Sequence, residues 1–117
     1  MSNAGVLRRV DPPSMRDRVE GGVDLRPLSP GTVVEARTKN SVYTIKLGDS
    51  GEILLAGHAE HCPQLTPVIS VGSVLLTGAV CDSYLAPGMR MEFRLGARRV
   101  FTSRLVSVAV RSGGAVV

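Results

Sequence analysis

The feature of this chain that most constrains its fold is the alternation of apolar and polar residues with a period of two. In MRMEFRL, residues 89–95, methionine, phenylalanine and leucine occupy one set of alternate positions, and arginine and glutamate occupy the other. Successive side chains of a β-strand point to opposite sides of the sheet, so this pattern indicates a half-buried strand with its charges in solvent. In SVYTIKL, residues 41–47, the apolar set is Tyr43, Ile45 and Leu47.

Similar short runs rich in Val, Ile, Leu and Thr continue from residue 28 onward, separated by turns that contain Gly, Pro or Asn. The segment TKNS, residues 38–41, has the composition of a tight hairpin turn. The last run, RVFTSRLVSVAV at 99–110, is either one bent strand or two. We therefore predict an all-β domain, a small barrel or sandwich of about seven short and mostly antiparallel strands.

Residues 1–27 differ from the rest of the chain because they are dense in charge, Pro and Gly and poor in apolar side chains. We predict a flexible N-terminal arm over 1–27, a β-barrel-like domain over 28–112 and a short tail over 113–117. A length of 117 residues, of which 44% are hydrophobic, suits one small domain. The start of the sequence lacks a secretory signal and no apolar run has membrane-spanning length, so we expect a soluble cytoplasmic protein that does not bind a membrane.

One phrase of the sequence occurs twice. LSPGTVVEAR at 28–37 returns as LAPGMRMEFR at 85–94, with Leu, Pro, Gly, Glu and Arg repeated at an offset of 57 positions. A Pro-Gly pair favours a turn, because Pro sets the φ of the second turn position and Gly accepts positive φ at the third. We predict two equivalent turn–strand units. Ancient duplication and chance recurrence both remain open as origins.

Candidate metal ligands are few. His58, His61, Cys62 and Cys81 are of types that zinc accepts, but they lack the paired spacing of zinc knuckles. Exposed histidines and buried free thiols are the favoured interpretation, and a disulfide between the cysteines is an alternative. No G-x-S-x-G elbow, P-loop or G-x-G-x-x-G motif occurs. We predict no catalytic residue, no cofactor and no enzyme activity, with a metal-dependent enzyme as the least favoured alternative.

Basic residues concentrate near the C-terminus. Residues 85–111 contain six arginines and a single acid, Glu92, a local charge of +5 against +4 for the whole chain. Arginines in such a row can bind phosphates bidentately. The candidate nucleic-acid-binding residues are Arg90, Arg94, Arg98, Arg99 and Arg104. Sheets that bind RNA usually offer aromatic side chains, and only Tyr84 and Phe101 are near, so an ordinary soluble surface is the competing interpretation.

Four short words resemble a pattern found in short uncharacterised bacterial all-β proteins: TKNSVY at 38–43, GS at 72–73, PGMRMEFRL at 87–95 and FTS at 101–103. The likeness spans roughly residues 28–108 and implies no activity, so it transfers no functional residue. It draws attention to five polar positions, for which hydrogen bonding within turns and strands is the favoured role: Asn40, Ser41, Tyr43, Thr102 and Ser103.

From these observations we predict first a non-enzymatic module for protein binding or self-assembly, with a protein partner or a second copy of the chain as its target. Edge strands, the N-terminal arm and the apolar tail are the features that favour association into a homo-oligomer. The alternative is a nucleic-acid-binding β-barrel that uses the arginine-rich strand face.

Overall fold

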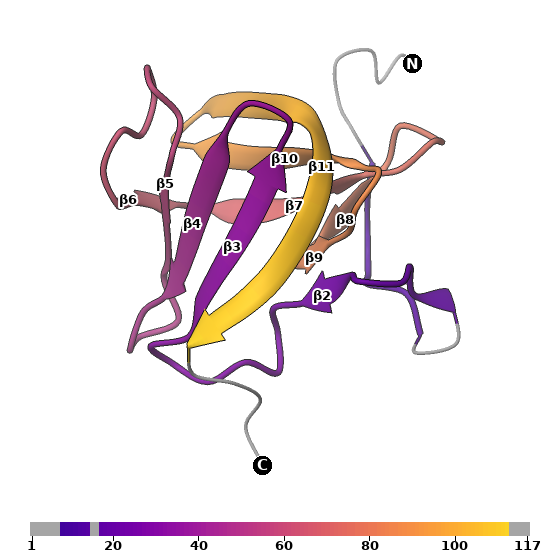
Figure 1. Cartoon of the computed structure of the whole chain (residues 1–117), viewed down its shortest axis with the longest axis horizontal. Coiled ribbons are helices and arrows are strands. Elements are labelled where there is room, and N and C mark those ends of the chain that lie inside the picture. Colours follow the sequence, from indigo (N-terminus) through magenta and orange to yellow (C-terminus); the bar gives the residue numbers. More distant parts are fainter. Residues whose placement is uncertain (1–7, 15–16, 113–117) are drawn as a thin grey trace.

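The computed structural model describes residues 8–14 and 17–112, and every regular element in this part of the chain is a β-strand (Figure 1). The strands are β1 (Arg9–Val10), β2 (Val23–Asp24), β3 (Val33–Thr38), β4 (Val42–Leu47), β5 (Ile53–Ala56), β6 (Thr66–Val68), β7 (Ser70–Val74), β8 (Val80–Asp82), β9 (Tyr84–Leu85), β10 (Arg90–Leu95) and β11 (Arg98–Ser112).

Nine of the strands form one mixed sheet in the order β1-β8-β7-β10-β11-β3-β4-β5-β6, and β2 and β9 form a separate pair. The strands β1 and β8 run parallel, and all the other pairs in the described chain are antiparallel. The predicted all-β class and the mostly antiparallel pairing are therefore confirmed.

Two details of the prediction are wrong: the number of strands, and the barrel as one of the two predicted architectures. The described chain has eleven strands instead of about seven, because β1, β2 and β9 are two residues long and too short to show an alternation. The sheet is also not closed into a barrel, since β1 and β6 stand at its two ends. The last apolar run belongs to a single strand, β11, which pairs with β10 up to Arg104 and with β3 from Leu105 onward.

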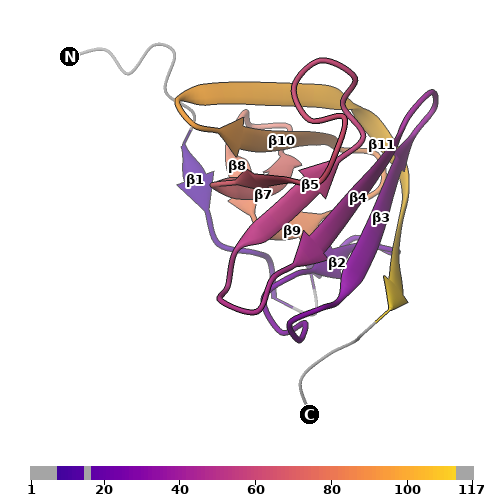
Figure 2. The same ribbon diagram turned by 90° about the vertical axis from the view of Figure 1, so that its left-hand side faces the viewer.

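The long strand β11 joins two halves of the sheet that pack against each other. Figures 1 and 2 show β3, β4 and β5 in one layer, with β7 and β10 crossing behind them in another. Ile45 and Leu55 of the first layer and Val71 and Phe93 of the second are all fully buried in one core cluster. A strand that switches between crossed layers at a bulge is usual in this kind of packing, and β11 has such an irregularity directly after Leu105.

The alternation predicted for the strands is largely what the burial shows. In β4, Tyr43 and Ile45 are buried, whereas Val42 and Lys46 are exposed. Apolar residues of β10 likewise fill the core. The exception is Glu92, which was expected in solvent and is described with the site below.

Polar positions in the hairpins make local hydrogen bonds. The Thr38 N–H donates to the Ser41 carbonyl at 2.9 Å, and the Ser41 N–H donates to Thr38 Oγ1 at 3.0 Å. In β11, Thr102 Oγ1 accepts from the Met91 N–H at 3.1 Å and donates to the Ser103 carbonyl at 2.7 Å. Ser41 and Thr102 thus have the turn and strand roles favoured for them from the sequence.

The two copies of the repeated phrase form equivalent turns. Gly31 and Gly88 both have positive φ, 87° and 86°. The Gly31 N–H donates to the Leu47 carbonyl at 2.7 Å, and the Gly88 N–H donates to the Leu105 carbonyl at 2.8 Å. In turn, the Leu47 N–H donates to the Thr32 carbonyl at 3.0 Å, and the Leu105 N–H donates to the Met89 carbonyl at 2.8 Å. The turns lead into the hairpins β3–β4 and β10–β11, as the prediction of two equivalent units requires.

The described part of segment 1–27 lies against the body of the protein. Strand β1 pairs with β8, and β2 pairs with β9. The buried Asp24 binds Arg26 at 2.8 Å and Arg18 at 3.0 Å. Leu25 also belongs to the main core cluster, and Val10 and Val19 pack against the second one. Ion pairs and a few apolar contacts thus hold a segment whose composition indicated an arm. The predicted tail, 113–117, lies outside the described residues.

Candidate anion-binding face

Four of the five arginines predicted to bind an anion lie on one face of β10 and β11. Arg90 is directly opposite Arg104, and Arg94 is directly opposite Arg99, in the register of the two strands. Directly opposite residues of antiparallel strands point to the same side of the sheet. The surface made by these four arginines and Phe101 is termed the β10–β11 face.

The fifth predicted arginine, Arg98, lies apart from this face. It is opposite Leu95 at the hairpin end of the two strands. Leu95 follows Arg94 directly, so it points to the other side of the sheet. The structure therefore does not bring Arg98 together with the other four.

The β10–β11 face contains an exposed aromatic ring. Phe101 is 39% exposed, is directly opposite Glu92, and has the Arg90 guanidinium carbon 5.8 Å from its ring centroid. That separation is within the range of a cation–π contact. Tyr84, the other nearby aromatic of the sequence, is buried, and its hydroxyl accepts a hydrogen bond from the Val19 N–H at 2.7 Å. Phe101 is thus the aromatic residue that this face offers to a ligand.

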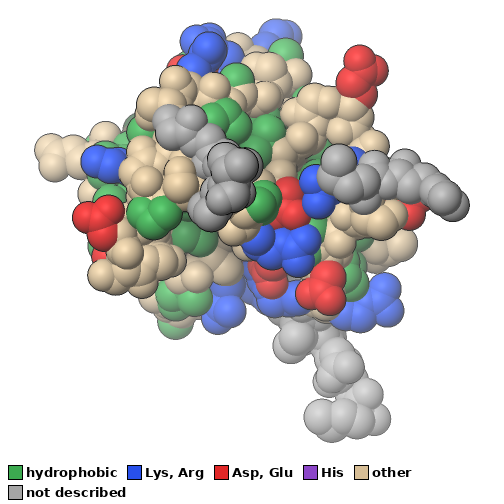
Figure 3. Space-filling model, turned by 90° about the horizontal axis from the view of Figure 1, so that it is seen from below, with side chains coloured by type: hydrophobic (Ala, Val, Ile, Leu, Met, Phe, Trp, Pro, Cys, Tyr) green, Lys and Arg blue, Asp and Glu red, His purple; other side chains and the backbone are tan. Residues whose placement is uncertain are grey.

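The arginines of the described chain divide into two groups. Six form ion pairs with carboxylates: Arg9, Arg18, Arg26, Arg37, Arg99 and Arg111. Five form no ion pair with a described residue: Arg8, Arg90, Arg94, Arg98 and Arg104. On the surface seen from below in Figure 3, basic side chains lie beside acidic ones. The β10–β11 face differs because three of its four arginines lack a carboxylate partner within the described residues.

Backbone contacts orient two of these arginines. Arg90 Nε donates to the Thr102 carbonyl at 3.0 Å, and Arg104 Nη1 donates to the Gly88 carbonyl at 2.9 Å. A guanidinium has five N–H donors, so each retains others for an external acceptor. The side chains are therefore partly positioned, and no described carboxylate pairs with either of them.

Glu92 is the acid of this region, and its predicted exposure is wrong. It is completely buried. Arg9 of β1 covers it, with Nη2 2.9 Å from Oε1 and Nη1 3.1 Å from Oε2, and Arg99 Nε lies 3.5 Å from Oε2. Arg9 Nε also donates to both carboxylate oxygens of Asp82, at 3.0 and 2.9 Å. Hydrogen bonds to Asp82 and then to Glu92 raise the pKa of Arg9 above its usual value.

A glycine leaves room for this ion cluster. Gly72 of β7 is directly opposite Asp82 on one side and Glu92 on the other. No side chain therefore stands between the two carboxylates, and the Arg9 guanidinium binds both. Sequence reasoning missed Arg9 because it belongs to the segment predicted to be an arm. A glycine inside the apolar strand SVGSV was the available signal, since such a residue often marks the close approach of another group.

The candidate metal ligands do not converge. The His58 and His61 rings lie 4.7 Å apart, and His58 Nδ1 accepts hydrogen bonds from the backbone N–H groups of Glu60 and His61. Cys62 belongs to the main core cluster, whereas Cys81 packs in the second cluster. No group of three or more potential ligands lies together in the described chain. Both cysteines are buried and free, and burial raises the pKa of each thiol, which favours the protonated, unreactive form.

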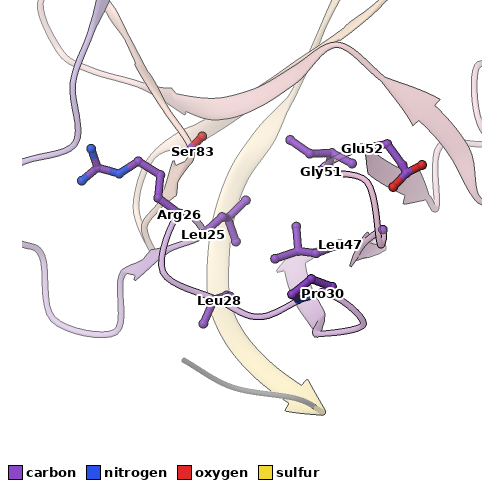
Figure 4. Close-up of a pocket in the computed structure, with 10 residues that line it drawn as sticks. Leu25, Arg26, Leu28, Pro30, Leu47, Gly51, Glu52 and Ser83 are labelled. Carbon is purple, nitrogen blue, oxygen red and sulfur yellow. The ribbon is translucent and has the colours of Figure 1, made fainter. Parts of the chain in front are cut away.

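A separate apolar cleft of about 230 Å³ lies between the segment that follows β2 and the β4–β5 turn (Figure 4). Leu25, Leu28 and Pro30 line one side, and Leu47 and Ile53 line the other. Arg26 and Glu52 lie at the margin of the cleft, and in Figure 4 their charged ends point away from it. Since ligand sites usually combine an apolar lining with convergent polar groups, this cleft is the weaker candidate.

No known protein family matches the chain, and neither does any curated protein or solved structure. No described segment forms a helix with the length and apolar character needed to cross a bilayer.

Proposed function

We propose that this chain is a non-enzymatic module that binds nucleic acid through the β10–β11 face. The observation that carries the proposal is that Arg90, Arg94 and Arg104 have no carboxylate partner in the described chain and surround an exposed phenylalanine. Guanidinium groups bind phosphate oxygens in pairs of parallel hydrogen bonds, and a row of them follows a phosphodiester backbone.

The environment of Arg94 also supports an anionic ligand. Its Nε is buried and has no hydrogen-bond partner among the described residues. A buried unsatisfied donor is costly and calls for a cause. A phosphate bound at the face would draw the guanidinium outward and supply the missing acceptor.

The proposal is tested by fluorescence anisotropy of a labelled mixed-sequence oligonucleotide. Three phosphate contacts on a single strand predict that the logarithm of the binding constant falls against the logarithm of salt concentration with a slope of roughly −2. In the double variant Arg90→Ala/Arg104→Ala, we expect the slope to shrink to roughly −0.7, because one contact remains. The affinity at low salt should fall at least about tenfold.

A matched control variant also removes two arginines, but from another part of the sheet. Arg37 and Arg111 both bind Glu35 at 2.8 Å on the other half of the sheet. The variant Arg37→Ala/Arg111→Ala should retain wild-type affinity and slope. If the control lost as much affinity as the test variant, net charge alone would account for binding. Failure of the wild type to bind at low salt would contradict the proposal.

Self-assembly, the function predicted first from the sequence, has one observation in its favour. Val106 and Val110 of β11 are 64% and 41% exposed. Strand addition is poorly supported, since β1 has two residues and β6 contains Pro67, which cannot donate a backbone hydrogen bond.

Assembly through these valines predicts a solution mass above 12.4 kDa that falls on dilution, measured by light scattering. It also predicts that Val106→Asp shifts the protein to monomer. A monomeric mass at all concentrations would contradict the assembly hypothesis.

A further inference from the structure

We infer that the β10–β11 face takes an unpaired nucleotide, whose base stacks on Phe101 while its phosphates bind the flanking arginines. This inference rests on the proposed function and specifies its ligand as single-stranded. Base–aromatic stacking tolerates any sequence, because every base has a π-face.

The position of Phe101 within the face supports stacking. Along β10 the arginine pairs Arg90/Arg104 and Arg94/Arg99 lie on either side of the Glu92–Phe101 pair. Arg94 follows Arg90 by four positions along the strand, a span of about 13 Å. A ligand that crosses the ring therefore meets guanidinium groups before and after it. The ring provides apolar contact where the arginines provide charge.

Glu92, the acid beside the ring, is paired with arginines and therefore does not repel a bound anion. Glu92 is directly opposite Phe101, but Arg9 and Arg99 bind its carboxylate and it is fully buried. The carboxylates of Asp82 and Glu92 are thus both paired with Arg9, so the positive charge beside the ring comes from the arginines of the face. Arg9 acts as a positioning residue in this arrangement, because it works through Glu92 and not through the ligand.

Arg90 links the ring to the phosphate. Its guanidinium lies near the Phe101 ring, while its Nε is bonded to the Thr102 carbonyl. While Nε stays bonded to the Thr102 carbonyl, the Nη1 and Nη2 donors of Arg90 are available to the phosphate of a nucleotide whose base covers the ring. Bases of a duplex are already stacked and paired, so a duplex can use the arginines but not the ring. Single strands should therefore bind better than duplexes.

Phe101→Leu removes the aromatic ring and keeps an apolar side chain. We expect it to weaken binding of a labelled oligothymidine of about twelve nucleotides roughly tenfold. Binding of a duplex of the same length, and competition by inorganic polyphosphate, should change by less than about twofold, because these ligands use charge alone. Circular dichroism checks that the variant folds.

A second variant measures stacking directly. The chain contains no tryptophan, so Phe101→Trp introduces a single fluorescent reporter at the proposed contact. We expect oligothymidine to quench its fluorescence and polyphosphate to leave it unchanged. If oligothymidine bound without quenching Trp, or if Phe101→Leu weakened all three ligands equally, the inference would be overturned while the proposed function would stand. Absence of binding by every polyanion would overturn both.

Discussion

Replacement of Arg9 by alanine is expected to lower the free energy of unfolding by about 3 kcal/mol, as found when one partner of a buried ion pair is removed. Glu92 is completely buried, and Arg9 makes two of its hydrogen bonds. Without Arg9 the carboxylate would keep, among the described residues, the contact with Arg99 at 3.5 Å. We take the lower end of the usual range because Arg9 itself is 23% exposed and Arg99 remains.

Urea denaturation followed by circular dichroism measures this effect. The double variant Arg9→Ala/Glu92→Gln should recover most of the lost stability, because the buried charge is removed together with its partner. Arg18→Ala is a matched control: it also removes an arginine of the N-terminal segment, but its partner Asp24 keeps Arg26. If Arg9→Ala cost no more than Arg18→Ala, the role of Arg9 in stabilising the buried Glu92 would be wrong.

Replacement of Gly72 by alanine should destabilise the protein by about 2–3 kcal/mol, as overpacking of a close contact does. An added Cβ at this position would lie 2.5 Å from the Cys81 carbonyl oxygen and 3.0 Å from the Asp82 Cα. Both obstacles are backbone atoms, so β7 and β8 would have to separate. Because β8 carries Asp82 and pairs with β1, the ion cluster around Arg9 should loosen as well.

Thermal unfolding of Gly72→Ala is compared with that of Gly51→Ala. An added Cβ at Gly51 meets nothing within 4 Å, although its φ of 85° disfavours a side chain. This control therefore reports backbone strain alone, about 1–2 kcal/mol. Equal losses in the two variants would contradict the close approach of β7 and β8. Hydrogen exchange should also speed up in β8 and β1 for Gly72→Ala only.

Much of the fold follows from the period-two pattern of the sequence. In β4 and β10 the alternation identifies which side chains enter the core, because burial in a strand follows the pleat. The Pro-Gly turns at Gly31 and Gly88 likewise follow from local turn chemistry, and their equivalent hydrogen bonds agree with the repeated phrase. Whether the repeat arose by duplication stays a prediction.

The parts that could not be predicted depend on long-range contacts. The strands β1, β2 and β9 exist because a partner strand is present, and two residues carry no periodicity of their own. Glu92 alternates with apolar residues, and this pattern predicts a solvent-exposed side chain. Instead Arg9, 83 residues away in the sequence, covers it. A charged residue with a distant partner cannot be assigned as buried from its local pattern.

The candidate site could be predicted from the sequence in part. Alternation places Arg90 and Arg94 on one face, and the hairpin brings Arg99 and Arg104 beside them. The sequence does not distinguish arginines that are neutralised by a carboxylate from those that are not. It also does not show that Phe101 is exposed whereas Tyr84 is buried, since both lie in apolar strands. These distinctions, which carry the proposed function, come from the tertiary structure.

The most direct test of the central claim is mapping of backbone amide chemical shifts in the ¹⁵N-labelled protein during titration with single-stranded oligothymidine. We predict that the largest changes occur in β10 and the first half of β11, around Arg90, Phe101 and Arg104, with little change in β4 and β5. Changes concentrated on β3, β4 and β5, or around the apolar cleft, would contradict the assignment of the β10–β11 face as the binding surface.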